Sequence, residues 1–173
     1  KYSQIKNMTN EELIKTLTGE LNPKSNRLFV FSSSAGFRKK REPSISVIDT
    51  VSNMKIDTIE YQGEKMYPRA FKANPETNRL YLSNRGKINV INSENYSLEK
   101  SIEVKDVQAL EIDKRKNLLY FGSDNPFSVL VYDGTNHEFV KKIPVKGWNH
   151  AISDIILNPY RNLLYVWKIH NPE

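Results

Sequence analysis

Short runs of alternating hydrophobic and polar residues cover most of the chain, and turn-forming residues separate them. The clearest runs lie between residues 68 and 104. Residues 79–83 (RLYLS) are rich in strand-forming side chains, and residues 87–92 (KINVIN) alternate with the period of a half-buried strand. Residues 98–104 are more charged, which is typical of an outer strand. Together with residues 69–73, these runs predict four antiparallel strands.

The residues between the runs favour tight turns. Pro75 fixes its own φ, and Asn74 can hydrogen-bond to its own backbone, so residues 74–78 predict a turn. Gly86 can adopt a positive φ and predicts the next turn, and residues 93–95 predict a third. Four antiparallel strands joined by short turns form a meander, the unit of a β-propeller blade.

The same unit recurs along the chain. The second strands align as NRLFVFS, NRLYLSN, NLLYFGS and NLLYVWK, and their shared aromatic positions are Phe29, Tyr81, Tyr120 and Tyr165. These aromatic residues are 52, 39 and 45 residues apart, and the first spacing is longer because residues 32–43 carry an insertion. A four-stranded unit that repeats at this period is the signature of a propeller.

We therefore predict an all-β fold, a β-propeller of four-stranded antiparallel blades, of which about three and a half are present. The repeat region is expected at 17–173, with blades at 17–61, 66–104, 107–145 and, in part, 150–173. Residues 1–16 are the least repeat-like. Thr9 and Glu12 form a capping box there, which predicts a short helix.

The last predicted blade has only two strands. The strand around Tyr165 is therefore expected to have an unpaired edge, which invites pairing with another chain. We expect either that these residues belong to a larger ring or that a protein partner covers the ends.

The repeat resembles the YVTN-type β-propeller family. Tyr81-Leu82-Ser83-Asn84 stands where the family has Tyr-Val-Thr-Asn, residues 44–50 are close to its third strand, and residues 74–78 are similar to its first turn. The resemblance covers residues 17–167, although Trp167-Lys168 replaces the small polar pair in the fourth unit. It implies a radial propeller and an extracellular, cell-surface or periplasmic location. Because the family also includes enzymes and DNA-binding proteins, it leaves the activity open.

Composition narrows the classes of function. The length of 173 residues suits one domain, and no apolar run is long enough for a membrane span. Cysteine is absent, which excludes disulfides, thiol catalysis and cysteine-based metal sites. The net charge is +6, and the basic residues are interspersed with acidic residues along the strands. This pattern favours solvated outer strands over an anion-binding surface.

In a propeller, the loops that join the fourth strand to the next first strand share one face with the loops between second and third strands. Loops on a rigid scaffold usually carry binding residues. The candidate ligand- or partner-binding residues on this face are Tyr67, Arg69, Gln108, Trp148 and His150. The candidate polyanion-binding residues, in the insertion, are Arg38, Lys39, Lys40 and Arg41.

Other polar and aromatic residues are assigned to structure. Asp49, Asn92 and Asp133 end successive third strands, so they are expected to cap the turns that follow. Phe31 and Trp167 occupy equivalent strand positions and are expected to pack between blades.

The sequence contains no zinc-ligand spacing, phosphate-binding loop, dinucleotide fingerprint or nucleophilic serine motif. We therefore expect no catalytic residues, no metal site and no cofactor. The first hypothesis is a non-catalytic scaffold or binding module for a protein or ligand. The second is a lyase- or lactonase-type propeller enzyme that uses His150, four residues before Asp154, as an acid–base pair with a metal. The third is a nucleic-acid-binding propeller that uses residues 38–41.

Overall fold

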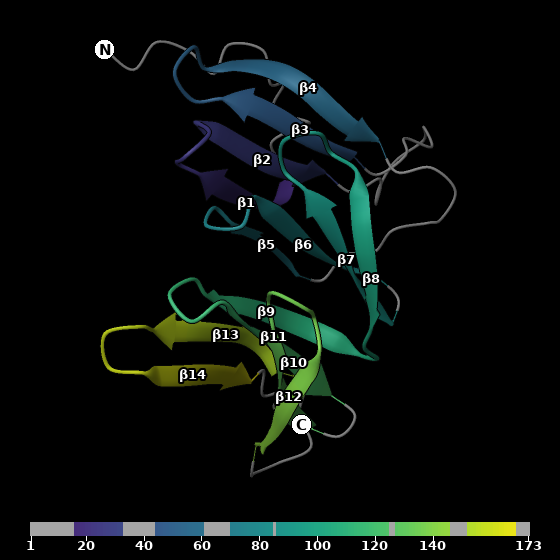
Figure 1. The fold of residues 1–173 in the computed structure, drawn as a ribbon, viewed down its shortest axis with the longest axis vertical. Helices are drawn as coiled ribbons and strands as arrows, with labels where there is room; N and C mark the ends of the chain where they lie inside the picture. The colour runs from purple at the N-terminus through teal and green to yellow at the C-terminus, as the bar shows by residue number, and fades with distance from the viewer. Residues whose placement is uncertain are drawn as a thin grey trace, which may run out of the picture. The chain divides into compact units, whose positions relative to one another are not determined.

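The computed structural model describes residues 16–32, 44–60, 70–84, 86–124, 127–145 and 152–168 (Figure 1). These residues form 14 β-strands, and no helix is found among them. The strands make three four-stranded sheets and one two-stranded sheet, all of them antiparallel. The predicted fold class, a partial β-propeller with an incomplete last blade, is thereby confirmed.

Each sheet follows the order of the chain. The first consists of β1 (Thr16–Asn22), β2 (Arg27–Ser32), β3 (Ser44–Asp49) and β4 (Met54–Glu60). The second, here called blade 2, consists of β5 (Phe71–Asn74), β6 (Arg79–Asn84), β7 (Lys87–Asn92) and β8 (Leu98–Glu103). Blade 3 consists of β9 (Val107–Asp113), β10 (Leu118–Asp124), β11 (Phe127–Asp133) and β12 (Phe139–Pro144). In blade 4 the described residues form β13 (Ile152–Asn158) and β14 (Leu163–Lys168).

The short helix predicted from Thr9 and Glu12 falls outside the described residues. Thr16, which the prediction placed in the N-terminal segment, is the first residue of β1.

The chain divides into two compact units, Lys1–Tyr67 and Pro68–Glu173. The first unit contains the sheet β1–β4, in which Phe29, Phe31, Ile45 and Val47 are fully buried. Phe31 is among these buried residues, and its packing between blades stays a prediction. The second unit contains blades 2, 3 and 4.

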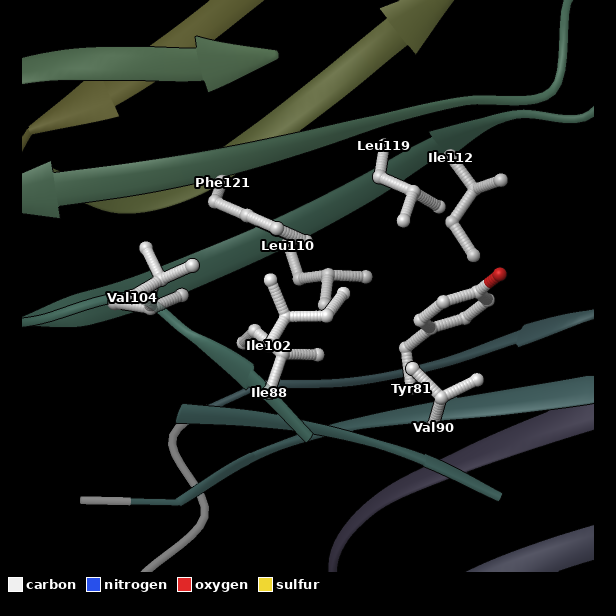
Figure 2. Packing of buried hydrophobic residues seen from close by; sticks show 10 residues of the cluster. Tyr81, Ile88, Val90, Ile102, Val104, Leu110, Ile112, Leu119 and Phe121 are labelled. Carbon is white, nitrogen blue, oxygen red and sulfur yellow. The ribbon is translucent and has the colours of Figure 1, made fainter. Parts of the chain in front are cut away.

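Blades 2 and 3 pack face to face through an apolar core (Figure 2). Tyr81 and Val90 of blade 2 lie on one side of this core, and Leu119 and Phe121 of blade 3 lie on the other. These side chains alternate along their strands with residues on the opposite face, as the sheet pleat requires. Each fully buried apolar side chain of this size contributes about 1.5–3 kcal/mol, so this core is the main link between the two blades.

Blades 3 and 4 pack through a second core on the opposite face of blade 3. Tyr120 and Val131 of blade 3 meet Ile152 and Ile155 of blade 4 there. Gly122 makes this approach possible, because a Cβ at that position would lie 2.8 Å from the Ile152 side chain. The contact with Ile152 leaves no room for a larger residue at the position of Gly122.

The repeated Asn at the start of each second-strand motif has a conformational cause. Asn26, Asn78, Asn117 and Asn162 have φ values of 53°, 52°, 50° and 52°. Among residues other than glycine, Asn adopts this left-handed conformation at low cost. The Asn-Arg-Leu and Asn-Leu-Leu motifs therefore mark the last residue of the turn between the first and second strands.

The predicted turn caps are confirmed. Side-chain Oδ1 atoms accept backbone N–H hydrogen bonds two and three residues on, for example Asn92 Oδ1 from Glu94 at 2.8 Å and Asn95 at 3.2 Å. Asp49 and Asp133 do the same. The turns after the first strands use the same device, through Asn22, Asn74, Asp113 and Asn158.

Trp167 does not pack between blades, and that prediction is wrong. Its side chain is 69% exposed on β14, whereas Phe31 at the equivalent position is fully buried. The physical reason is that blade 4 is the last sheet among the described residues of the second unit, so that unit supplies no following blade to cover Trp167.

Candidate functional site

The predicted binding residues are only partly within the described structure. Gln108 lies in β9 and is half-buried. The other candidates fall outside the described residues, and they are Tyr67, Arg69, Trp148, His150, Arg38, Lys39, Lys40 and Arg41. The site that can be built from the structure is therefore the surroundings of Gln108.

Gln108 follows a connection in which the backbone is tightly held. Asp106 has a φ of 55°, the left-handed conformation that lets the chain reverse from β8 into β9. The carbonyl of Asp106 accepts a hydrogen bond from the Asp124 N–H at 3.3 Å, and the Ser123 hydroxyl donates to the Lys105 carbonyl at 3.4 Å. The end of β10 thus fixes the loop that presents Gln108.

Equivalent hydrogen bonds hold the segments that lead into the first strands of blades 2 and 4, on the same side of the blades. The Ser83 hydroxyl accepts the Ala70 N–H at 2.8 Å, and the Ala70 carbonyl accepts the Ser83 N–H at 2.9 Å. Asp124 Oδ1 accepts the Ile152 N–H at 2.9 Å, which ties the end of β10 to the first strand of blade 4. We call this side of blades 2, 3 and 4, where second strands end and first strands begin, the loop face.

Asn84 adds a buried acceptor at the loop face. It is the last residue of β6 and is almost fully buried, and within the described part of the chain its Oδ1 accepts no hydrogen bond. A buried acceptor without a donor is costly, so this atom favours a hydrogen-bond donor from outside these residues.

Asp154, the possible partner of His150 in an acid–base pair, lies on β13. Its side chain is exposed, and its Oδ1 accepts the N–H of the next residue, Ile155, at 2.8 Å. Among the described residues, no group of three or more His, Asp or Glu side chains is placed to hold a metal ion. His150 itself is outside the described residues, so the pair remains a prediction.

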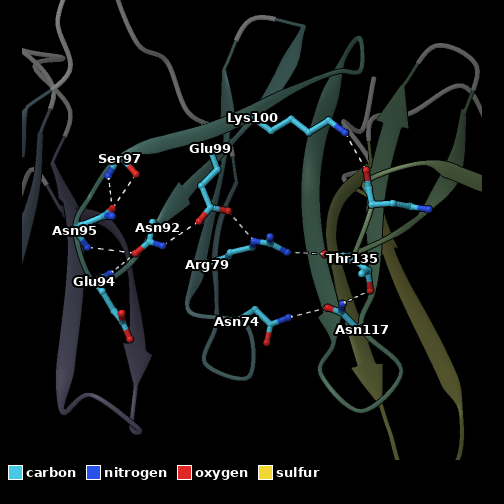
Figure 3. A network of polar contacts seen from close by, with 12 residues as sticks. Asn74, Arg79, Asn92, Glu94, Asn95, Ser97, Glu99, Lys100, Asn117 and Thr135 are labelled. Atoms are coloured by element: carbon cyan, nitrogen blue, oxygen red, sulfur yellow. Dashed lines mark hydrogen bonds and ion pairs between the residues drawn. The ribbon is translucent and has the colours of Figure 1, made fainter.

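A polar network on the opposite side of the blades was not predicted from the sequence (Figure 3). Arg79 of β6 forms an ion pair with Glu99 of β8, with 2.8 Å between Nε and Oε2. Its Nη1 also donates to the carbonyl of Gly134 at 3.0 Å, and Gly134 lies in the β11–β12 turn of blade 3. Lys100 Nζ donates to the Asn136 carbonyl at 2.8 Å. We call the contacts of Arg79 and Lys100 with this turn the blade 2–3 clamp.

Two buried titratable side chains lie beside the clamp, Tyr81 and His137, with ring centroids 6.1 Å apart. Burial raises the pKa of Tyr81. Burial also lowers the pKa of His137, and the cations Arg79 and Lys100 lower that pKa further. The carboxylates Glu99 and Asp133 act in the opposite direction on the pKa of His137 without reversing it.

The cluster is structural rather than catalytic. Tyr81 is fully buried and His137 is only 8% exposed, so a substrate does not reach their polar atoms. Within the described residues, neither Tyr81 Oη nor His137 Nε2 makes a hydrogen bond of good geometry, although the nearby side chains of Thr77 and Arg79 act against burial on the pKa of Tyr81. The sequence signal for the network is weak, because its residues are separated by 20–55 positions.

Comparisons with known proteins support the fold and do not identify a family. No protein-family model matches the chain, and no curated protein matches its sequence. Among solved structures, the chain is similar to the hydrazine synthase of Kuenenia stuttgartiensis, with a TM-score of 0.71 and 16% sequence identity. That match covers 96% of this chain, and this chain spans 45% of the length of that one. Since 566 solved chains share the fold, the likeness establishes the architecture alone.

Proposed function

We propose that this protein is a non-catalytic propeller module that binds a protein or ligand through its loop face, around Gln108. The observation that supports this proposal most directly is the set of polar links that fix the loop face. The side chains of Ser83, Ser123 and Asp124 each bind backbone at the start of a first strand or just before it. A binding surface that is held in advance loses little conformational entropy when a partner binds.

Several carboxylates at strand ends of the described blades already support the fold. The strand-end carboxylates Asp49, Asp113 and Asp133 accept turn N–H groups. A carboxylate engaged in this way supports a turn and is poorly placed to accept a proton from a substrate. The arrangement therefore favours a scaffold over an enzyme.

We also propose membership of the YVTN-type propeller family and an exported location, at the cell surface or in the periplasm. The support is the resemblance of Tyr81-Leu82-Ser83-Asn84 and of the repeated third strands to that family. Accessibility of the protein to added protease in intact cells or in released periplasm tests the location. Protection in both preparations would contradict it.

The binding proposal is tested with a photo-crosslinking side chain at three exposed positions. Lys105 lies on the loop face, Glu138 lies beside the β11–β12 turn on the opposite side, and Lys141 lies on the outer strand β12. In cells that produce the full chain, we expect a specific crosslinked product from Lys105 and not from the other two. Gln108→Ala should reduce the yield of that product severalfold.

A crosslinked product formed mainly from Lys141 would show binding along the outer strands and overturn the proposal. Circular dichroism of each variant serves as the control for folding.

A further inference from the structure

The turn between the first and second strands has the same frame in each described sheet. It begins at an Asn or Asp and ends at an Asn in the left-handed conformation, over residues 22–26, 74–78, 113–117 and 158–162. Asp113 Oδ1 accepts the N–H groups two and three residues on at 3.0 and 3.1 Å, and Asn158 Oδ1 does so at 3.2 and 3.1 Å. The frame of these turns is therefore fixed, while their middle positions differ in chemistry from blade to blade.

In blades 3 and 4 the middle positions carry cations and a tyrosine. Residues 113–117 read DKRKN and residues 158–162 read NPYRN, so the two turns hold four basic residues and one acidic residue. The acidic residue, Asp113, is buried, and its carboxylate is already engaged by turn N–H groups and by Lys116 at 3.9 Å. The basic side chains and Tyr160 are exposed. We call the following five residues the turn patch: Lys114, Arg115, Lys116, Tyr160 and Arg161.

Two side-chain contacts hold the two turns against each other. Lys116 Nζ donates to Asn162 Oδ1 at 2.8 Å. The Arg115 guanidinium lies over the Tyr160 ring, with 5.7 Å between Cζ and the ring centre, a cation–π distance. The strands that lead into these turns, β9 and β13, also lie side by side (Figure 1). The cations of two blades and the tyrosine ring therefore form one surface, on the side of the blades opposite the loop face.

Tyr160 is the most exposed large apolar side chain in the described part of the chain, at 90%. Its ring thus stays open to a ligand even though Arg115 lies over it. Cations gathered on rigid turns also repel one another, and an anionic ligand relieves this repulsion. A ring with a π-face, set among Lys and Arg side chains, is the arrangement by which proteins hold single strands of nucleic acid.

We propose that the turn patch binds single-stranded nucleic acid without sequence preference. The basic side chains pair with phosphates, and one base stacks on Tyr160. A duplex keeps its bases stacked inside, so it would leave the tyrosine ring unused. The proposal concerns the end of the blades opposite Gln108 and is independent of ligand binding at the loop face.

The hydrogen-bonding groups of the patch favour a nucleic acid over an acidic polysaccharide. Sugar hydroxyl groups need acceptors as well as donors. The side-chain acceptors of the two turns are already engaged, because Asp113 and Asn158 accept turn N–H groups and Asn162 accepts Lys116. What the patch offers is cationic donors and a ring face, which match phosphates and a base.

The test measures binding of a fluorescent oligothymidylate of about 12 nucleotides to the full chain by fluorescence anisotropy. We expect the logarithm of the association constant to fall with the logarithm of salt concentration with a slope of about −2 to −3, as for three or four phosphate contacts. Replacing all four basic residues of the turn patch by Gln should abolish detectable binding. Circular dichroism and the urea midpoint of each variant serve as controls for folding.

A second variant controls for net charge. The insertion at residues 38–41 also carries four basic residues, and replacing these by Gln lowers the net charge by the same amount. Since the proposal places no contact there, binding of this variant should stay within about twofold of that of the unchanged protein.

Variants of Tyr160 separate stacking from charge. Tyr160→Leu should weaken binding about tenfold, because it removes the ring on which a base stacks, whereas Tyr160→Phe should bind within about twofold of the unchanged protein. Both variants keep the four cations, so the salt slope should not change. An abasic oligonucleotide of the same length should bind equally well to Tyr160→Leu and to the unchanged protein.

Three results would overturn the proposal. The first is no binding of oligothymidylate at low salt. The second is loss of binding in the variant of residues 38–41 with binding retained in the variant of the turn patch, which would place the site in the insertion. The third is tighter binding of polygalacturonate than of oligothymidylate, which would make an acidic polysaccharide the partner.

Discussion

Replacing the aromatic residue of the second strand should have very different effects in different blades. Tyr81 and Tyr165 occupy the same position of the repeat. Tyr81 is fully buried between blades 2 and 3, whereas Tyr165 is 52% exposed on β14. If packing against the next blade determines how much each tyrosine side chain contributes to the free energy of unfolding, Tyr81→Ala will destabilise the second unit much more than Tyr165→Ala.

The magnitudes follow from burial. Truncation of a fully buried aromatic side chain to alanine costs about 3–5 kcal/mol, because transfer energy is lost and a cavity is left. Tyr165 buries only about half of its surface, so its truncation should cost about 1 kcal/mol. Tyr81→Phe isolates the hydroxyl group. Because Tyr81 Oη makes no hydrogen bond of good geometry in the described structure, this change should cost less than about 1 kcal/mol.

Urea unfolding followed by tryptophan fluorescence measures these costs, since both tryptophans, Trp148 and Trp167, lie in the second unit. For a urea m value of about 1.5 kcal/mol/M, Tyr81→Ala should lower the midpoint by about 2–3 M and Tyr165→Ala by less than about 1 M. Equal shifts for the two alanine variants would refute the argument that burial by a neighbouring blade, rather than the repeat position, sets the contribution.

Three further predictions concern single features. Gly122→Ala pushes a Cβ against Ile152, so amides of β13 should exchange at least about tenfold faster, and unchanged exchange would contradict the packing at that glycine. Asp133→Ala removes the acceptor of two turn N–H groups and should lower the urea midpoint, while Asp133→Asn, which keeps an acceptor oxygen, should recover most of the loss. His137 has a lowered pKa in the folded protein, so the unfolded chain binds its proton first as the pH falls below 6.5. Stability should therefore decrease from that pH down to the folded pKa, and His137→Gln should abolish this part of the dependence, as pH-dependent urea midpoints will show.

The strands and turns could be predicted from the sequence because their determinants are local. The alternation in residues 87–92 corresponds to β7, and the Asn that precedes each second strand adopts a positive φ. Asp49, Asn92 and Asp133 cap turns two and three residues away. In each case the side chain and the backbone group that it contacts are close in the sequence, so the pattern contains the whole interaction.

Contacts between blades could not be predicted in the same way. Arg79 looked like a polar strand residue, yet its guanidinium meets the Gly134 carbonyl of the next blade. The equivalent strand positions of Phe31 and Trp167 predict that both side chains pack between blades. Trp167 is nevertheless exposed, because burial at this position depends on a sheet that follows in the chain. The predicted site was placed mostly on connecting loops, and of its residues only Gln108 falls within the described strands.

The blade 2–3 clamp has a mechanical consequence. A force applied to the described end of β14 loads this strand first. Among the described strands, β14 forms backbone hydrogen bonds with β13 alone, so these bonds can open one after another. Separating blade 2 from blade 3 instead requires the contacts of Arg79 and Lys100 with the β11–β12 turn to break together with the apolar core. In a single-molecule pulling experiment, blade 4 should therefore peel away at low force before blades 2 and 3 yield together in one abrupt, higher-force event.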